Sequence, residues 1–287
     1  MTVLVTGATG TIGSELVRLL SGNGHLVRAF SRSAEKISAL SLPEVEAFPG
    51  NFAEEDRLKA AHEGVEVLVL ITPSAPDAAD HARACIYAAR LAGVRKVVRL
   101  SAIKAETGGP TENTRLHALT EAEIRESGMD HVFLRPNFFM QNLFMVAETI
   151  KAKGTFSFAN GDGRTGLIDT RDVALCLRHC VESDRWNGAA HELTGPEAIS
   201  LQEAAERLSA LLGKPVRYDP VRPQDAHDFA LTSGWGPWLA ALLRDYGAAY
   251  SSGWGDFVTG QVEKITGQPA RRFEDFAEDL LLPVLRT

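Results

Sequence analysis

The sequence predicts an α/β protein, with a doubly wound parallel sheet followed by a smaller, mainly helical C-terminal lobe. Short apolar runs alternate with helical patterns up to residue 135, which is typical of parallel strands joined by helical crossovers. Beyond residue 135 the rhythm changes and helical patterns dominate. We therefore expect one part at residues 1–135, to which some later segments return, and a smaller lobe at residues 136–287.

Six short apolar runs are the predicted strands of the first part. The run TVLV at residues 2–5 is continuously apolar, as expected for a strand that is buried on both faces of a parallel sheet. The other runs lie at residues 25–30, 45–48, 66–71, 96–101 and 131–135. Apolar residues at helical spacing separate the runs, for example over residues 12–24, 77–92 and 114–127.

The C-terminal lobe is predicted from shorter patterns. Two apolar pieces, at residues 155–158 and 166–169, flank a glycine-rich stretch, NGDGRTG. Helical patterns then cover residues 172–182, residues 200–212 and the stretch from Trp235 to the end. Open α/β sheets bind ligands at the carboxyl ends of their strands, so we expect this lobe to lie over that edge.

Composition narrows the classes of partner. With 45% apolar and 23% charged residues, the chain has the makeup of a soluble globular protein. Its net charge of -7 argues against a nucleic-acid or membrane partner, because both require a concentrated positive surface. Three cysteines are too few for a disulfide framework, and no apolar run approaches the ~20 residues that span a bilayer. We expect a cytoplasmic protein with a small-molecule partner; the oligomeric state stays open, with a homodimer among the alternatives.

The stretch VTGATGTIGSE, residues 5–15, places three glycines three residues apart, at Gly7, Gly10 and Gly13. They follow a predicted buried strand and open a predicted helix. Glycine allows a tight turn and a close approach of the backbone to a pyrophosphate, and the helix N-terminus offers free N–H groups to this anion. The pattern therefore predicts a dinucleotide site of the Rossmann type.

The end of the second predicted strand selects the dinucleotide. A carboxylate there, about 20 residues after the glycines, would bind the ribose 2′-hydroxyl of NAD. The chain has FSRSAEK instead, with Ser31, Arg32 and Lys36 and no acidic residue at the strand end. A guanidinium pairs with a 2′-phosphate through charge-assisted hydrogen bonds, and a lysine adds a second positive charge. The sequence therefore predicts NADP(H) as the cofactor.

At these motifs and at three longer segments, the chain resembles the NmrA-like branch of the atypical short-chain dehydrogenase/reductases. It is similar in particular to bacterial NADPH-dependent quinone reductases and triphenylmethane-dye reductases. The longer segments are HALTEAEIRESGMDHVFLRPNFFMQN at 117–142, GLIDTRDVA at 166–174 and HELTGPEAISLQEAAERLSALLGKPV at 191–216. The resemblance covers essentially the whole chain. It implies a Rossmann sheet, NADPH along the carboxyl edge of that sheet, and a substrate cleft beneath the C-terminal lobe.

The resemblance also implies roles for individual residues. The pyrophosphate would be held by Gly7, Thr9, Gly10, Thr11, Ile12 and Gly13. The 2′-phosphate would be bound by Arg32 and Lys36 beside Ser31, and the adenine would lie near Asn51, where many relatives have an aspartate. The ribose or nicotinamide would be lined by Thr72 and Pro73, with Ser101 beside the reacting ring. The nicotinamide and the substrate would be framed by Asn137, Phe138 and Phe139.

The chain departs from better-known members of this superfamily at their catalytic pair. Those enzymes use a tyrosine and a lysine four residues apart, whereas this chain has Asn113 and His117 at the two places. The missing phenol argues against alcohol–ketone chemistry. His117 is the candidate catalytic residue, as a ligand of the cofactor ribose or as a proton donor. Quinone reduction tolerates the loss, because the hydride passes directly to an electron-poor ring and water supplies the protons.

An NADPH-dependent reductase of quinones or similar planar electron acceptors is therefore the predicted function. Two alternatives remain open here: a redox-sensing regulator that binds NADP(H) without turnover, and a reductase of an enone or a dye. Seven aromatic residues between Phe229 and Phe257 form either the core of the lobe or a lid that stacks on a flat substrate. No metal site is predicted, because the pairs His81–Cys85 and Cys176–Cys180 lack further ligands.

Overall fold

The computed structural model describes residues 1–286 and divides into two compact units. Unit 1 comprises residues 1–109, 113–135 and 173–192. Unit 2 comprises residues 110–112, residues 136–172 and the chain from residue 193 onward. Among the helices of the described residues, none has the length and apolar character that crossing a membrane would require.

A seven-stranded sheet forms the centre of unit 1. Its order is β3-β2-β1-β4-β5-β6-β8, and the pairs among the first six strands are all parallel. The bounds are β1 (Thr2–Thr6), β2 (Leu26–Ser31), β3 (Val45–Pro49), β4 (Val67–Leu70), β5 (Lys96–Leu100), β6 (Asp130–Pro136) and β8 (Ala189–Leu193). The strand order reverses beside β1, so the predicted doubly wound fold class is confirmed.

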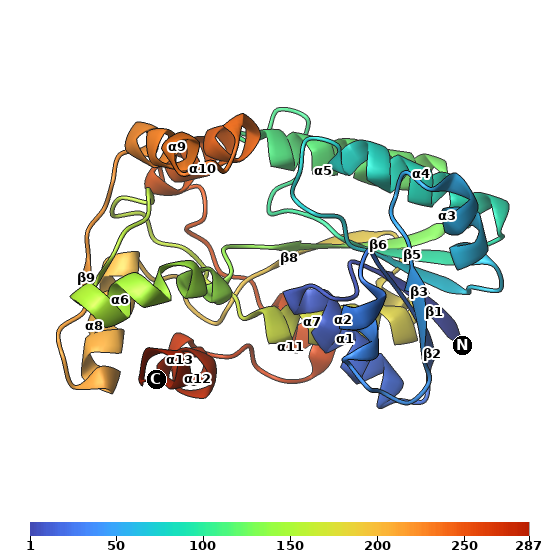
Figure 1. The fold of residues 1–287 in the computed structure, drawn as a ribbon, viewed down its shortest axis with the longest axis horizontal. Helices are drawn as coiled ribbons and strands as arrows, with labels where there is room; N and C mark the ends of the chain where they lie inside the picture. The colour runs from blue at the N-terminus through green and yellow to red at the C-terminus, as the bar shows by residue number, and fades with distance from the viewer. Residues whose placement is uncertain (287) are drawn as a thin grey trace. The chain divides into compact units, whose positions relative to one another are not determined.

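Helices cover both faces of this sheet (Figure 1). One face carries α1 (Thr11–Ser21), α2 (Ala34–Ser38) and α7 (Thr170–Glu182), and the other carries α3 (Glu55–His62), α4 (Ala78–Leu91) and α5 (Glu112–Glu126). The central strands are buried between these layers: four of the five residues of β1 and all four residues of β4 are buried. This explains why these two strands are nearly continuous apolar runs rather than alternating ones.

The three cysteines are free thiols, and all of them are buried in unit 1. Cys85 lies on α4, and Cys176 and Cys180 lie on α7. Burial raises the pKa of Cys85 and of Cys180 to about 12, because the charged thiolate is poorly solvated there. At neutral pH the thiols of Cys85 and Cys180 are therefore protonated, and all three cysteines pack as small apolar groups.

Unit 2 is mainly helical, as predicted. It contains η1 (Met140–Val146), α6 (Ala147–Lys153), α8 (Leu201–Leu212), α9 (Pro223–Thr232), α10 (Pro237–Ser251), α11 (Gln261–Thr266), α12 (Phe273–Phe276), the π-helical turn η3 (Ala277–Leu281) and α13 (Leu282–Arg286). A two-stranded sheet pairs β7 (Thr155–Phe156) with β9 (Arg217–Tyr218). A short 3-10 turn, η2 (Asp184–Trp186), belongs to unit 1.

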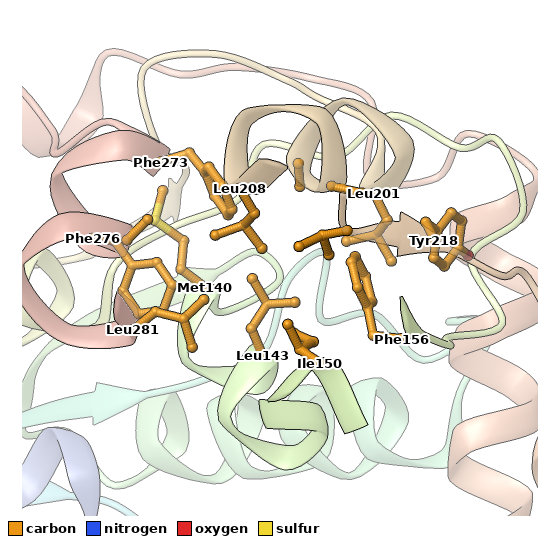
Figure 2. Packing of buried hydrophobic residues seen from close by; sticks show 14 of the residues in the cluster. Met140, Leu143, Ile150, Phe156, Leu201, Leu208, Tyr218, Phe273, Phe276 and Leu281 are labelled. Carbon is orange, nitrogen blue, oxygen red and sulfur yellow. The ribbon is translucent and has the colours of Figure 1, made fainter. Parts of the chain in front are cut away.

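An apolar core of its own holds unit 2 together. Figure 2 shows Leu201 and Leu208 of α8 facing Leu143 and Ile150, with Phe276 closing one end of the cluster. A capping box starts α8 at this core: the Ser200 hydroxyl accepts from the Glu203 N–H at 3.1 Å, and the Glu203 carboxylate accepts from the Ser200 N–H at 2.7 Å. Such a cap fixes the start of a helix and orients its apolar face toward the core.

The helical patterns predicted from Trp235 to the end are confirmed, but they do not form one continuous helix. Four helices occupy this stretch instead, α10 to α13, and α9 precedes it. The breaks coincide with glycines in the left-handed region, such as Gly253 (φ +80°) and Gly267 (φ +75°). Glycine adopts this conformation readily, so it ends a helix where an apolar periodicity alone would continue it.

Candidate functional site

The glycine turn joins β1 to α1 and is shaped by contacts that exclude side chains. Gly7 has a φ of +62°, in the region that favours glycine, and the Gly10 N–H donates to its carbonyl oxygen at 3.0 Å. A Cβ atom added at Gly13 would overlap this same carbonyl oxygen. Gly10 is the N-cap of α1 and supplies no side-chain cap. The N–H groups of the first helical turn therefore remain available to an anion, and the turn fits a pyrophosphate.

The end of β2 is connected to the glycine turn. The hydroxyl groups of Thr9 and Ser31 share a hydrogen bond of 2.7 Å. Ser33 caps α2 by accepting from the Lys36 N–H at 3.2 Å. The side chains of Arg32 and Lys36 are exposed, and neither cation has a partner among residues 1–286. Two unpaired positive charges thus lie beside the turn, as a 2′-phosphate would require.

Asn51 follows β3, and its side chain is engaged in its own turn. The Asn51 Oδ1 accepts from the Ala53 N–H at 2.9 Å, and the Asn51 amide donates to the Glu54 carboxylate. This is an Asx-type turn, in which the side chain takes the place of a backbone group. The predicted place of Asn51 near the adenine stays a prediction.

Arg99, on β5, connects three elements of unit 1 although it is only 1% exposed. Its Nη1 donates to the carbonyl of Leu70, at the end of β4, at 3.0 Å. Its Nη2 donates to the Thr72 hydroxyl at 2.9 Å and lies 3.3 Å from Nδ1 of His117 on α5. Two of the predicted site residues, Thr72 and His117, are therefore brought together by a cation that the sequence patterns did not single out.

His117 is buried, and its pKa lies well below its usual value. Burial is the largest cause, followed by the positive charges of Arg99 and Arg135. A guanidinium only donates hydrogen bonds, so Nδ1 of His117 must accept from Arg99. The ring is then neutral and carries its proton on Nε2. This assignment is inferred from the hydrogen-bond partners and makes His117 a donor at Nε2.

Ser101, directly after β5, donates its hydroxyl proton to Glu121 on α5 at 2.7 Å. Glu121 is 1% exposed and is neutralised by Arg135 at 2.6 Å and Arg125 at 3.1 Å. A buried carboxylate requires such partners, because an unpaired charge in the interior is costly. This network fixes the start of the chain segment after β5, where Ser101 is predicted to lie beside the reacting ring.

The predicted substrate segment, Asn137 to Phe139, directly follows β6 and belongs to unit 2. The Asn137 amide donates to the Gly255 carbonyl at 3.0 Å, and its Oδ1 accepts from the Phe138 N–H at 2.8 Å. The Phe138 ring meets Phe158 and Tyr250 edge-on, with centroids at 5.8 and 5.5 Å. Phe139 is half-buried at the start of η1. The segment is thus held in an aromatic frame within unit 2.

The aromatic stretch between Phe229 and Phe257 divides into buried and exposed members. Tyr250 is 4% exposed and contacts Tyr246 and Trp254, with centroids at 5.8 and 5.4 Å. Phe229 and Trp235 are 62% and 41% exposed and contact each other edge-on. Packing in the core therefore explains the presence of Tyr250, but not that of the exposed pair Phe229 and Trp235.

Sequence reasoning missed Arg99 and Arg135, although a signal for Arg99 was present. The run KVVRL is a predicted core strand that carries two cations, Lys96 and Arg99, and both are fully buried. Buried cations are rare unless paired, so their presence in such a run marks a polar network.

Comparisons with known proteins identify the family of this chain. A family model described as NAD(P)H-binding matches residues 7–184. An NAD(P)H azoreductase of Xenophilus azovorans is 36% identical over 276 residues, covering 96% of each chain. The NADPH complex of an NADPH-dependent quinone oxidoreductase from Escherichia coli is 26% identical, with a TM-score of 0.88 over 97% of this chain and 99% of that one.

A triphenylmethane reductase of Citrobacter sp., complexed with NADP(H), has a TM-score of 0.84 at 23% identity, over 97% of this chain and 100% of that one. At this identity the likeness shows the fold alone. The family match and the azoreductase alignment cover most or nearly all of the chain. The chain therefore belongs to the NAD(P)H-binding family, and its predicted resemblance to bacterial NADPH-dependent quinone reductases is confirmed.

Proposed function

We propose that the protein is an NADPH-dependent reductase of quinones or similar planar electron acceptors. The observation that carries the proposal is the state of His117, a neutral donor that replaces the superfamily's lysine in a site without the tyrosine. This arrangement suits an acceptor that takes up hydride directly and draws its proton from solvent. The relatives named as an azoreductase and a quinone oxidoreductase support the same acceptor class.

When bound, NADPH supplies the hydride. The N–H groups of the glycine turn would bind its pyrophosphate, and Arg32 and Lys36 its 2′-phosphate. The donors Thr72 and His117 would orient the nicotinamide ribose. The aromatic frame around Phe138 would stack on the acceptor. These residues bind and align rather than exchange protons, which is the contribution that hydride transfer needs most.

The cofactor preference is tested at Arg32. The unaltered protein should bind NADPH more tightly than NADH by roughly tenfold to a hundredfold, the weight of a hydrogen bond between charged groups. Replacing Arg32→Asp should erase or reverse this preference in a fluorescence titration. The control is Arg18→Asp, at an exposed arginine of α1, which changes the net charge equally and should leave the preference intact. Equal affinity for both cofactors in the unaltered protein would disprove the assignment.

Turnover is tested by measuring NADPH oxidation with a panel of quinones, azo dyes and enones. Saturable turnover of a quinone supports the proposal. Tight NADPH binding without oxidation across the panel would instead support the redox-sensing regulator. Turnover restricted to the enones or to the dyes would replace the proposed acceptor class but keep the reductase.

A further inference from the structure

Arg99 is an unusual residue to find at the centre of a sheet. Its guanidinium is 1% exposed, and among residues 1–286 no carboxylate forms an ion pair with it. Its Nε has no hydrogen-bond partner within the same residues. Burial lowers its pKa to about 10, with the nearest opposing influence from Glu121, so the group still carries its charge at neutral pH. A fold would not retain so poorly compensated a cation for packing alone.

The partners that Arg99 does have are all acceptors. They are the Leu70 carbonyl at 3.0 Å, the Thr72 hydroxyl oxygen at 2.9 Å and His117 Nδ1 at 3.3 Å. Since a guanidinium cannot accept, each partner must offer a lone pair. Thr72 then keeps its own hydroxyl proton for another acceptor, and His117 keeps its proton on Nε2. The hydrogen bond of the His117 ring to Arg99 engages Nδ1 and leaves Nε2 to another partner.

We infer that Arg99 is a positioning residue that converts Thr72 and His117 into hydrogen-bond donors for the nicotinamide ribose. Residues that touch a reactive group are commonly oriented by a second hydrogen bond of this kind. The inference rests on the proposed function, because it takes the ligand to be the hydroxyl-bearing sugar of a bound dinucleotide. The charged groups around the imidazole are Arg99 and, farther away, Arg135, with Glu121 paired to Arg135.

The tautomer of His117 is the direct readout, and it needs no activity assay. Long-range ¹H–¹⁵N spectra of the full chain labelled at its eight histidines report which ring nitrogen carries the proton. The set of histidine signals that disappears in the variant His117→Gln is assigned to His117. We expect His117 to be protonated at Nε2 and unprotonated at Nδ1 throughout pH 5.5 to 8. An Nδ1–H tautomer in the unaltered protein would overturn the inference.

The variant Arg99→Met removes the donor and its charge. The His117 signals should then show both tautomers, and NADPH should bind about tenfold more weakly, as expected for the loss of one hydrogen bond. The matched control is Lys96→Met, which removes the other buried cation of β5, held by the Ser183 carbonyl and Asp184. It should leave the His117 signals unchanged. Unchanged signals in Arg99→Met, or the same change in both variants, would overturn the inference.

A second variant keeps the test decisive if Arg99→Met does not fold. Arg99→Lys retains the positive charge, but a single ammonium group cannot donate to all three acceptors as the planar guanidinium does. His117 should stay neutral while its tautomers mix; a pure Nε2–H signal would overturn the inference. Adding NADPH should shift the His117 Nε2 resonance of the unaltered protein, and bound NADPH without that shift would contradict the ribose contact. A shift without quinone turnover would refute the proposed function alone.

Discussion

A proton on His117 would sit beside a permanent cation. Nδ1 lies 3.3 Å from Nη2 of Arg99, and two unit charges about 3.3 Å apart repel by about 5 kcal/mol at an effective dielectric constant of 20. The ring is also buried, which disfavours its charged form further. A neutral imidazole is a poor acid near pH 7, so under the proposed function His117 would orient the cofactor rather than donate a proton.

This distinction predicts the kinetics of His117→Ala. The kcat for a quinone with saturating NADPH should fall by less than about tenfold, because a lost orienting hydrogen bond weighs about 1 kcal/mol. A general acid would contribute about 10²–10⁴-fold. Phe139→Ala, in the predicted substrate segment, should lower kcat at least as much. A thousandfold loss at His117 with NADPH affinity intact would make it a catalytic acid.

At the level of single residues, the sequence pointed to the glycine turn, Arg32 and His117, because each belongs to a recognisable local pattern. Arg99 belongs to none. Its partners lie at residues 70, 72 and 117, and only the folded sheet brings these together. Tertiary contacts decide which residue holds a given side chain in place. A sequence motif therefore indicates the residues that bind the ligand, but not the residues that position them.

Among the elements, the turn between β1 and α1 is closely packed against its own backbone. The Gly7 carbonyl accepts from the Gly10 N–H and occupies the space that a side chain at Gly13 would need. The helix therefore begins within van der Waals distance of the strand end. That closeness brings the N–H groups of α1 to the sheet edge where an anion can reach them.

The variant Gly13→Ala should accordingly disturb both stability and binding. We expect the free energy of unfolding to fall by about 1–3 kcal/mol, as for other overpacked sites, and NADPH affinity to fall at least tenfold because the turn must move. Urea unfolding and fluorescence titration measure the two effects. Gly108→Ala is the control, since nothing lies within 4 Å of a Cβ atom added there. Unaltered NADPH binding by Gly13→Ala would remove this turn from the site.

The strands β1 to β6 were the elements that the sequence predicted best, whereas the edge strand β8 was not predicted. The six runs named from the sequence lie within one or two residues of β1 to β6, because short runs rich in apolar and β-branched residues mark the strands of a sheet that is covered on both faces. The strand β8, AAHEL, has only two buried residues of five and follows the stretch where the rhythm had changed. The α9 helix was missed for a similar reason, since only one of its ten residues is buried.

For the whole molecule, buried histidines link stability to pH. Burial lowers the pKa of His62 and of His117 below 6.5, so the unfolded chain binds protons more readily than the folded one. Stability is then fully present above pH 6.5 and decreases as the pH falls below this value. The raised carboxyl pKa values of Glu192 and Asp172 act in the opposite direction, from ordinary values of 4.5 and 3.8.

Urea unfolding at pH 7.5, 6.5 and 5.5 should therefore show a declining free energy of unfolding. Each histidine contributes at most about 1.4 kcal/mol per pH unit below 6.5. The double variant His62→Gln/His117→Gln should flatten this slope. The comparison is between the slopes of the free energy of unfolding against pH. The packing lost in the variant lowers this free energy equally at each pH, so it does not change the slope. An equally steep slope in the double variant would assign the pH dependence to other groups.

The burial of the three thiols has a chemical consequence for a protein that handles quinones. Quinones are electrophiles that alkylate thiolates, and the thiolate rather than the thiol is the nucleophile. Cys85, Cys176 and Cys180 all lie in the interior, and the pKa of Cys85 and of Cys180 is about 12. The chain therefore presents its proposed acceptors with no exposed thiol that they can arylate.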